Sequence, residues 1–74
     1  FKEIALEIRE KWENVSPHAK PYLDAMACID SSDKNAKYHY DSAAFIVAYF
    51  LSNAIGFQGD DAIRIKAELK SMIQ

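Results

Sequence analysis

Cysteine is nearly absent from this chain of 74 residues, in which Cys28 is the only one. A lone cysteine cannot close a disulfide within the chain, whereas small secreted domains usually depend on several. The sequence therefore predicts a reducing compartment, and we expect a cytoplasmic protein. Because the first residue is Phe1 rather than methionine, this expectation leaves open whether a targeting segment has been removed.

Glycine and proline are also scarce, with two of each, whereas half of the residues are hydrophobic and 27% are charged. This composition argues against disordered and fibrous chains, which have few apolar residues or strong compositional bias. A chain of this length buries only about 60% of the surface that its unfolded form exposes. We therefore expect one compact domain over residues 1–74.

The sequence has no large excess of charge of either sign and no long apolar run. Nine Lys and Arg residues against eleven Asp and Glu residues give a formal net charge of -2. This near balance disfavours nucleic acid or anionic lipid as the main partner. The longest apolar run, 43–51, has nine residues, whereas a transmembrane helix needs about 20, so we expect no membrane span.

The first half of the chain carries the patterns of two helices. Residues 1–15 have an apolar stripe at steps of three and four, which is typical of one helix face. The stripe consists of Phe1, Ile4, Ile8, Trp12 and Val15. Ser16 and Pro17 end this helix and open the next over 17–29, with Ser16 as N-cap. Pro21 predicts an irregular first turn there.

The second half carries two more helices after a polar loop over residues 30–37. Asp41 or Ser42 caps a helix over 42–55, which Gly56 ends, and a last helix covers 60–73. A β-strand is the competing interpretation of residues 45–51, but the flanking start and stop signals favour a helix. The sequence thus predicts an all-α fold, a compact four-helix domain, bundle-like or orthogonal, with its topology undecided.

Three segments resemble small helical proteins encoded by phages and other bacterial mobile elements. They are AKPYLDAM at 19–26, DSAAFIVAYFLSNA at 41–54 and RIKAELK at 64–70. The similarity covers roughly residues 15–73, and its segments are helix-forming patterns rather than chemical signatures. The resemblance implies a bacterial or phage cytoplasmic setting and contributes no catalytic site, because no activity is assigned to such proteins.

Two acidic pairs, Glu10 with Glu13 and Asp30 with Asp33, match the outline of a magnesium site in helical nucleotide pyrophosphohydrolases. Carboxylates three apart on a helix can share a divalent cation that binds a triphosphate. The second pair falls in the polar loop, however, and no basic residues cluster near it. We expect these acids to be solvated. A metal-dependent nucleotide pyrophosphohydrolase is therefore the least favoured of the three functional hypotheses considered for this chain.

A nucleophile, base and carboxylate could in principle be supplied by Cys28, His39 and Asp41. The spacing contains no local motif, and Cys28, between Ala27 and Ile29, is expected to act as a small buried hydrophobe. His18 and His39 likewise lack the spacing of a zinc site. We therefore expect no enzymatic activity, no cofactor and no metal.

The stretch Leu51–Ile65 loosely fits a helix-turn-helix, with Gly56 at the turn, and DNA binding is the alternative hypothesis. Its contacts would be made by Arg64, Lys66 and Lys70. Asp60 and Asp61 open the second helix, however, where a recognition helix approaches phosphates. An ordinary helical hairpin explains the pattern as well.

The helix over 42–55 is apolar in every direction, and we expect a domain this short to leave one of its sides uncovered. We expect Val47, Phe50, Leu51 and Ala54 to face the core. Phe45 and Tyr49 lie on another side and are the candidate interface, unless Trp12 and the segment 38–40 cover them. The preferred interpretation is a small non-catalytic interaction or accessory protein that forms a homodimer or binds an unidentified protein.

Overall fold

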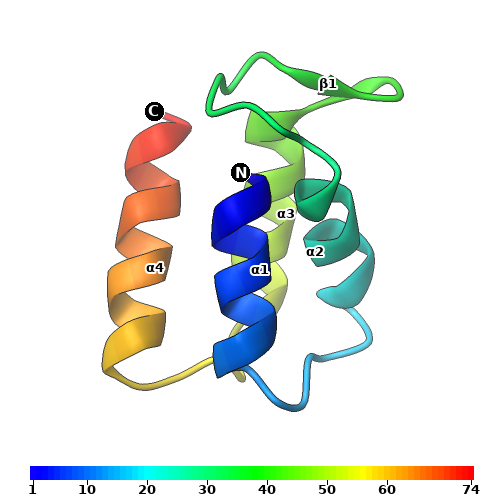
Figure 1. Ribbon diagram of the computed structural model, residues 1–74. Coiled ribbons are helices and arrows are strands. Elements are labelled where there is room, and N and C mark those ends of the chain that lie inside the picture. Colours follow the sequence, from blue (N-terminus) through cyan, green and yellow to red (C-terminus); the bar gives the residue numbers. More distant parts are fainter.

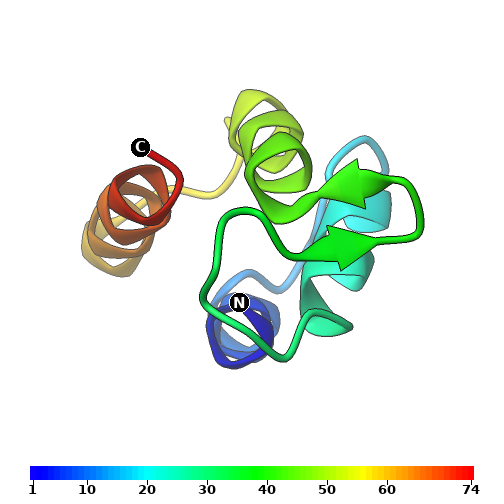
Figure 2. The same ribbon diagram turned by 90° about the horizontal axis from the view of Figure 1, so that it is seen from above.

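The computed structural model describes all 74 residues and is mostly helical (Figure 1). Its helices are α1 (Lys2–Lys11), α2 (Lys20–Ala27), α3 (Ala43–Asn53) and α4 (Asp60–Met72). Successive helices run in opposite directions, and both α2 and α4 contact α1 and α3 (Figures 1 and 2). The four-helix expectation is therefore supported, with an up-and-down arrangement as the topology. None of the helices is long and apolar enough to cross a membrane.

A two-stranded sheet departs from the all-α expectation. Strands β1 (Lys37–Tyr38) and β2 (Asp41–Ser42) pair antiparallel, with Tyr38 opposite Asp41, at one end of the helices (Figure 2). The turn between them is possible because His39 takes a positive φ of 58°, which histidine tolerates better than most residues. Residue 37, expected at the end of the loop, and residue 42, expected in the helix, therefore belong to strands.

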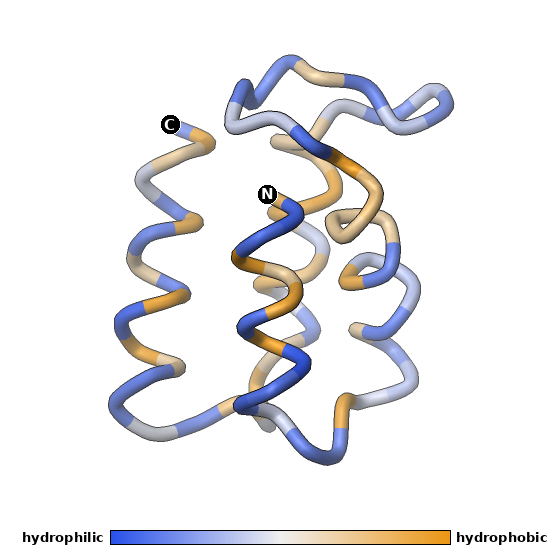
Figure 3. Tube along the Cα trace, in the orientation of Figure 1, coloured by the Kyte–Doolittle hydropathy of each residue, from blue (hydrophilic) through white to orange (hydrophobic).

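The buried residues are all hydrophobic, and each helix contributes to one core. Ile8, Leu23, Phe50 and Leu69 are fully enclosed between the helices. Figure 3 shows hydrophobic segments in orange recurring along α1 and α4 between hydrophilic segments in blue. Directly after α1, the Trp12 ring stacks on Phe57 with a centroid distance of 5.3 Å and meets Phe50 edge-on at 6.3 Å.

Helices α1 and α2 are shorter than the sequence pattern predicts. Trp12 has extended backbone angles (φ -108°, ψ 93°), so α1 ends at Lys11 and Val15 lies outside it. Ser16 does not cap α2, because its hydroxyl accepts from the His18 N–H over 3.2 Å in a preceding turn. Helix α2 begins at Lys20, which places Pro21 in the first turn, where its missing N–H leaves no helical hydrogen bond unmade.

The ends of α3 agree with the sequence in one case and differ in the other. The Ser42 hydroxyl accepts from the Phe45 N–H over 3.2 Å and caps the helix, as expected. The helix ends at Asn53, and Gly56 does not take the left-handed conformation expected of it. The glycine with positive φ is Gly59, at 108°, immediately before α4.

Candidate functional site

Three aromatic rings form an exposed cluster on the flank where α2 and α3 meet. Tyr49 stacks on Tyr22 with a centroid distance of 5.5 Å and contacts Phe45 at 4.5 Å. Phe45 is 49% exposed and Tyr49 is 44% exposed. We call Tyr22, Phe45 and Tyr49 the aromatic patch. Tyr22, the third ring, is half-buried.

The geometry of α3 explains this placement. Successive residues of a helix are rotated by about 100° around its axis. Val47 and Phe50, with Ala54 directly after the helix, therefore lie on the same side of α3, and all three are completely buried. Phe45 and Tyr49, four residues apart, fall on the side next to α2. Leu51 departs from expectation, because it is only half-buried and faces a surface groove next to α4 instead of joining the core.

The alternative covering of Phe45 and Tyr49 by Trp12 and the segment 38–40 is not found. Trp12 is occupied by its contacts with Phe57 and Phe50 at the opposite end of α3. Tyr40 is 97% exposed at the hairpin turn, and the Tyr38 ring packs against His39 at 4.4 Å. The aromatic patch therefore stays open within one copy of the chain.

Tyr22 also belongs to this patch, although no sequence pattern singled it out. In the structure Tyr22 is half-buried, while Leu23 and Met26 are enclosed. Adjacent residues lie about 100° apart on a helix, so Tyr22 and Leu23 point in different directions, and Tyr22 is the one that lies beside α3.

The four acids of the nucleotide-hydrolase hypothesis do not lie together. Glu10 and Glu13 line a cleft at the end of α1 with Trp12 and Gly56. Asp30 lines a different pocket, and the Asp33 carboxylate accepts from the Asn35 N–H over 2.9 Å within the loop. Nowhere do three or more His, Cys, Asp or Glu side chains approach closely enough to hold a metal ion.

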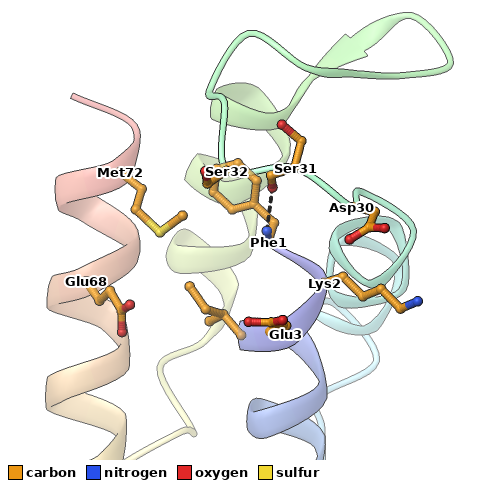
Figure 4. A pocket seen from close by; sticks show the side chains of 9 residues that line it. Phe1, Lys2, Glu3, Asp30, Ser31, Ser32, Glu68 and Met72 are labelled. Carbon is orange, nitrogen blue, oxygen red and sulfur yellow. Dashed lines mark hydrogen bonds between the residues drawn. The ribbon is translucent and has the colours of Figure 1, made fainter.

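The pocket beside Asp30 has a volume of about 350 Å³ and is shown in Figure 4. The Phe1 nitrogen donates to the Ser31 carbonyl over 2.6 Å at its upper edge. Glu3 from α1 and Glu68 from α4 line the pocket as well, so its carboxylates come from three separate segments. Lys2 is the one basic side chain in its lining.

Cys28 lies at the end of α2, whereas His39 and Asp41 belong to the β1–β2 hairpin. Cys28 ends α2 and is exposed, which corrects the expectation of a buried thiol. Helix α2 ends at this position, and the Cys28 side chain does not share the buried side of the helix on which Met26 lies. His39 lies in the hairpin turn, and no hydrogen bond connects it to Cys28.

The helix-turn-helix residues fold as an antiparallel pair, since α3 and α4 run side by side in opposite directions (Figures 1 and 2). A DNA-binding helix-turn-helix instead crosses its helices at about 90–120°. Arg64 donates to the Glu7 carboxylate over 2.6 Å and approaches Asp61 at 3.5 Å. The Glu7 hydrogen bond and charge, aided by Asp61, raise the pKa of Arg64 above its ordinary value.

The three basic residues of that hypothesis occupy two different sides of α4. Arg64 faces α1, where its carboxylate partner Glu7 lies. Lys66 and Lys70 line the groove next to Leu51 of α3, and the Lys66 ammonium lies 5.8 Å from the centre of the Phe57 ring. They therefore form no single basic surface with Arg64.

Comparison of the chain with protein-family models, with curated proteins and with solved structures finds no match to any of them.

Proposed function

We propose that this chain is a non-catalytic helical interaction protein that self-associates through the aromatic patch. The observation that carries the proposal is the pair of half-exposed rings, Phe45 and Tyr49, four residues apart beside Tyr22. Large apolar groups left in water on a small domain gain free energy when a second surface covers them. The phage or mobile-element character and the cytoplasmic setting belong to the same proposal, and the exposed Cys28 thiol suits a reducing compartment.

The simplest assembly is a homodimer in which both copies contribute the same patch. Such an isologous contact needs a surface that is complementary to itself, and aromatic rings meet this need by offset or edge-to-face packing. Helix α3 carries no charged residue, so no like charge on this helix opposes its copy across the axis. The net charge of -2 adds only weak repulsion between copies.

The size of the patch sets the expected affinity. A fully covered aromatic side chain buries about 150–250 Å², so three half-covered rings offer on the order of 300 Å² per copy. The total of about 600 Å² over two copies is below the range of stable specific interfaces, so we expect a weak, transient contact with a dissociation constant between about 10 μM and 1 mM. The association is therefore predicted to be dynamic and dependent on concentration.

Light scattering on the purified protein and two variants tests this proposal. We expect the mass of the wild type to rise above the 8.4 kDa of one chain as concentration increases. Tyr49→Glu should remain at the monomer mass, because a carboxylate in the patch would be desolvated on association. Tyr40→Glu, the same change at an exposed tyrosine outside the patch, should behave as the wild type does.

Circular dichroism of both variants establishes that their helices are intact. Two results would overturn the proposal: a wild-type mass that stays at one chain at every concentration, or equal association by folded Tyr49→Glu and wild type. Turnover of nucleoside triphosphates with magnesium, lost on Glu10→Gln, would contradict the non-catalytic assignment.

A further inference from the structure

A second surface lies on the opposite flank of α3, in the groove that this helix forms with α4. Its volume is about 430 Å³, and its lining consists of Leu51 from α3 and of Ile63, Lys66, Ala67 and Lys70 from α4. We propose that this groove, hereafter the α3/α4 groove, binds an amphipathic helix with acidic side chains supplied by another protein. The inference is independent of self-association through the aromatic patch.

Helix α4 divides its side chains among three directions. Ala62, Ile65 and Leu69 are buried in the core. Asp61 and Arg64 face α1, where they pair with Lys11 and Glu7. Ile63, Lys66, Ala67 and Lys70 follow the spacing i, i+3, i+4 and i+7 and so form one stripe beside α3. Ile63, Ala67 and Lys70 of this stripe are exposed, and Lys66 is half-buried.

Charge complementarity indicates an acidic partner. The ion pairs of the chain engage Arg9, Lys11 and Arg64, and none of them includes Lys66 or Lys70. Helix α3, the opposite wall, contains no charged residue. The groove thus carries two unpaired positive charges in a protein of net charge -2. Carboxylates on a bound helix would pair with these lysines at the edge of the contact.

The apolar part of the groove indicates a helix rather than a nucleic acid. Ile63 is 69% exposed and lies in the stripe one turn before Lys66 and Ala67. The stripe from Ile63 to Lys70 extends about 10 Å along α4, which matches two turns of a partner helix with apolar anchors at i, i+3 or i+4, and i+7. A phosphate backbone has no group that would cover Ile63 and Leu51, and Asp60 and Asp61 lie at one end of the stripe.

Lys66 is held in a position that suits this role. Its ammonium lies 5.8 Å from the centre of the Phe57 ring, within the range of a cation–π contact. Such a contact reduces the number of side-chain conformations that binding must restrict. Lys70, one turn further along α4, is exposed and extends the positive edge in the same direction.

The test uses two designed helical peptides of about 18 residues, a length at which an isolated helix is partly formed. One peptide has leucine at i, i+3, i+4 and i+7 with flanking glutamates, and the other has lysine in place of each glutamate. We expect the acidic peptide to bind at least fivefold more tightly than the basic one. Amide shifts in nuclear magnetic resonance spectra should be centred on Leu51, Ile63 and Ala67.

Three variants connect the binding to the groove. The double variant Lys66→Glu, Lys70→Glu should reverse the preference in favour of the basic peptide. Lys37→Glu, a reversal at an exposed lysine of β1, should keep the acidic preference, as should Tyr49→Glu in the aromatic patch. Equal binding of both peptides, an acidic preference that survives the double variant, or no binding at millimolar peptide would overturn the inference. Tighter binding of duplex DNA that the double variant abolishes would assign the groove to nucleic acid instead.

Discussion

Arg64 on α4 donates a hydrogen bond of 2.6 Å to the Glu7 carboxylate on α1, although 57 residues separate them in the chain. Asp61 approaches the same guanidinium at 3.5 Å and also pairs with Lys11 at 3.5 Å. Four alternating charges therefore join α1 to α4. The opposite side of α4, which lines the α3/α4 groove, has no such pairs, and this asymmetry leaves one flank of the helix available for a partner.

The α1–α4 charge network is expected to make only a small, salt-sensitive contribution to stability. Its side chains are between about one third and one half exposed, and ion pairs so near the surface contribute little. We predict that Arg64→Ala lowers the melting temperature slightly at low ionic strength and that the difference shrinks in about 1 M salt, where screening is strong. Thermal unfolding at both salt concentrations measures this effect, and a large loss that salt leaves unchanged would contradict it.

Ionisation of Arg64 should not make the free energy of unfolding depend on pH near neutrality. Glu7 raises the pKa of Arg64 in the folded chain. A group whose pKa is raised on folding stabilises the fold below its unfolded pKa, and this stabilisation is lost as pH rises through the folded value. For arginine that loss begins only above about pH 12. The difference between wild type and Arg64→Ala should therefore be constant from about pH 7 to 9.

Substitutions at the centre of the core should destabilise the protein far more than substitutions in the α1–α4 charge network. Phe50 is completely buried and contacts Trp12 edge-on. We predict that Phe50→Ala destabilises the protein by about 3–5 kcal/mol, because it removes apolar contacts and leaves a cavity. Urea titration measures the loss. Tyr40→Ala at the exposed hairpin turn is the control and should change stability by less than about 0.5 kcal/mol.

The capping role of Ser42 gives a matched pair of serines in α3. The Ser42 hydroxyl accepts from the Phe45 N–H at the start of the helix, whereas the Ser52 hydroxyl donates to the Ala48 carbonyl inside it. Ser42→Ala should lower the free energy of unfolding by about 1 kcal/mol, since the Phe45 N–H loses its hydrogen-bond acceptor. Ser52→Ala should be neutral or slightly stabilising, because alanine favours helix interiors. Equal effects of the two changes in urea titration would show that Ser42 is not a functional cap.

The two glycines should respond differently to alanine. Gly59 has φ 108° and ψ 178°, a conformation that is open almost only to glycine. Gly59→Ala is predicted to cost about 1–3 kcal/mol for this reason. Gly56 has no positive φ, and an added Cβ would meet the Trp12 ring at an ordinary 3.7 Å. Gly56→Ala should therefore be tolerated, and thermal unfolding of both variants distinguishes the two positions.

Sequence patterns predicted α1, α2 and α4 from apolar residues at helical spacing, and α3 from an apolar run between start and stop signals. The bounds of α4 were closest, Asp60–Met72 against 60–73, since its acidic start and apolar spacing are both local signals. The end of α1 was wrong because Trp12 leaves the helix to stack on Phe57, a contact with a residue far along the chain. A contact between residues so far apart in the chain cannot be read from the spacing of apolar residues within one helix.

The candidate surfaces were predicted only in part. The exposure of Phe45 and Tyr49 followed from the excess of apolar residues on α3, whereas Tyr22 joins them through tertiary contact. The α3/α4 groove was not anticipated, because Lys66 and Lys70 had been grouped with Arg64, which the fold directs toward α1. Which side of a helix faces which neighbour depends on topology, and the sequence left topology undecided.

Self-association through the aromatic patch is tested most directly by amide nuclear magnetic resonance spectra recorded from about 10 μM to 1 mM protein, a range that spans the expected affinity. The account predicts slower diffusion at high concentration and shifts centred on Tyr22, Phe45 and Tyr49, with the α3/α4 groove unchanged. Spectra and diffusion that are identical across the whole range would contradict it.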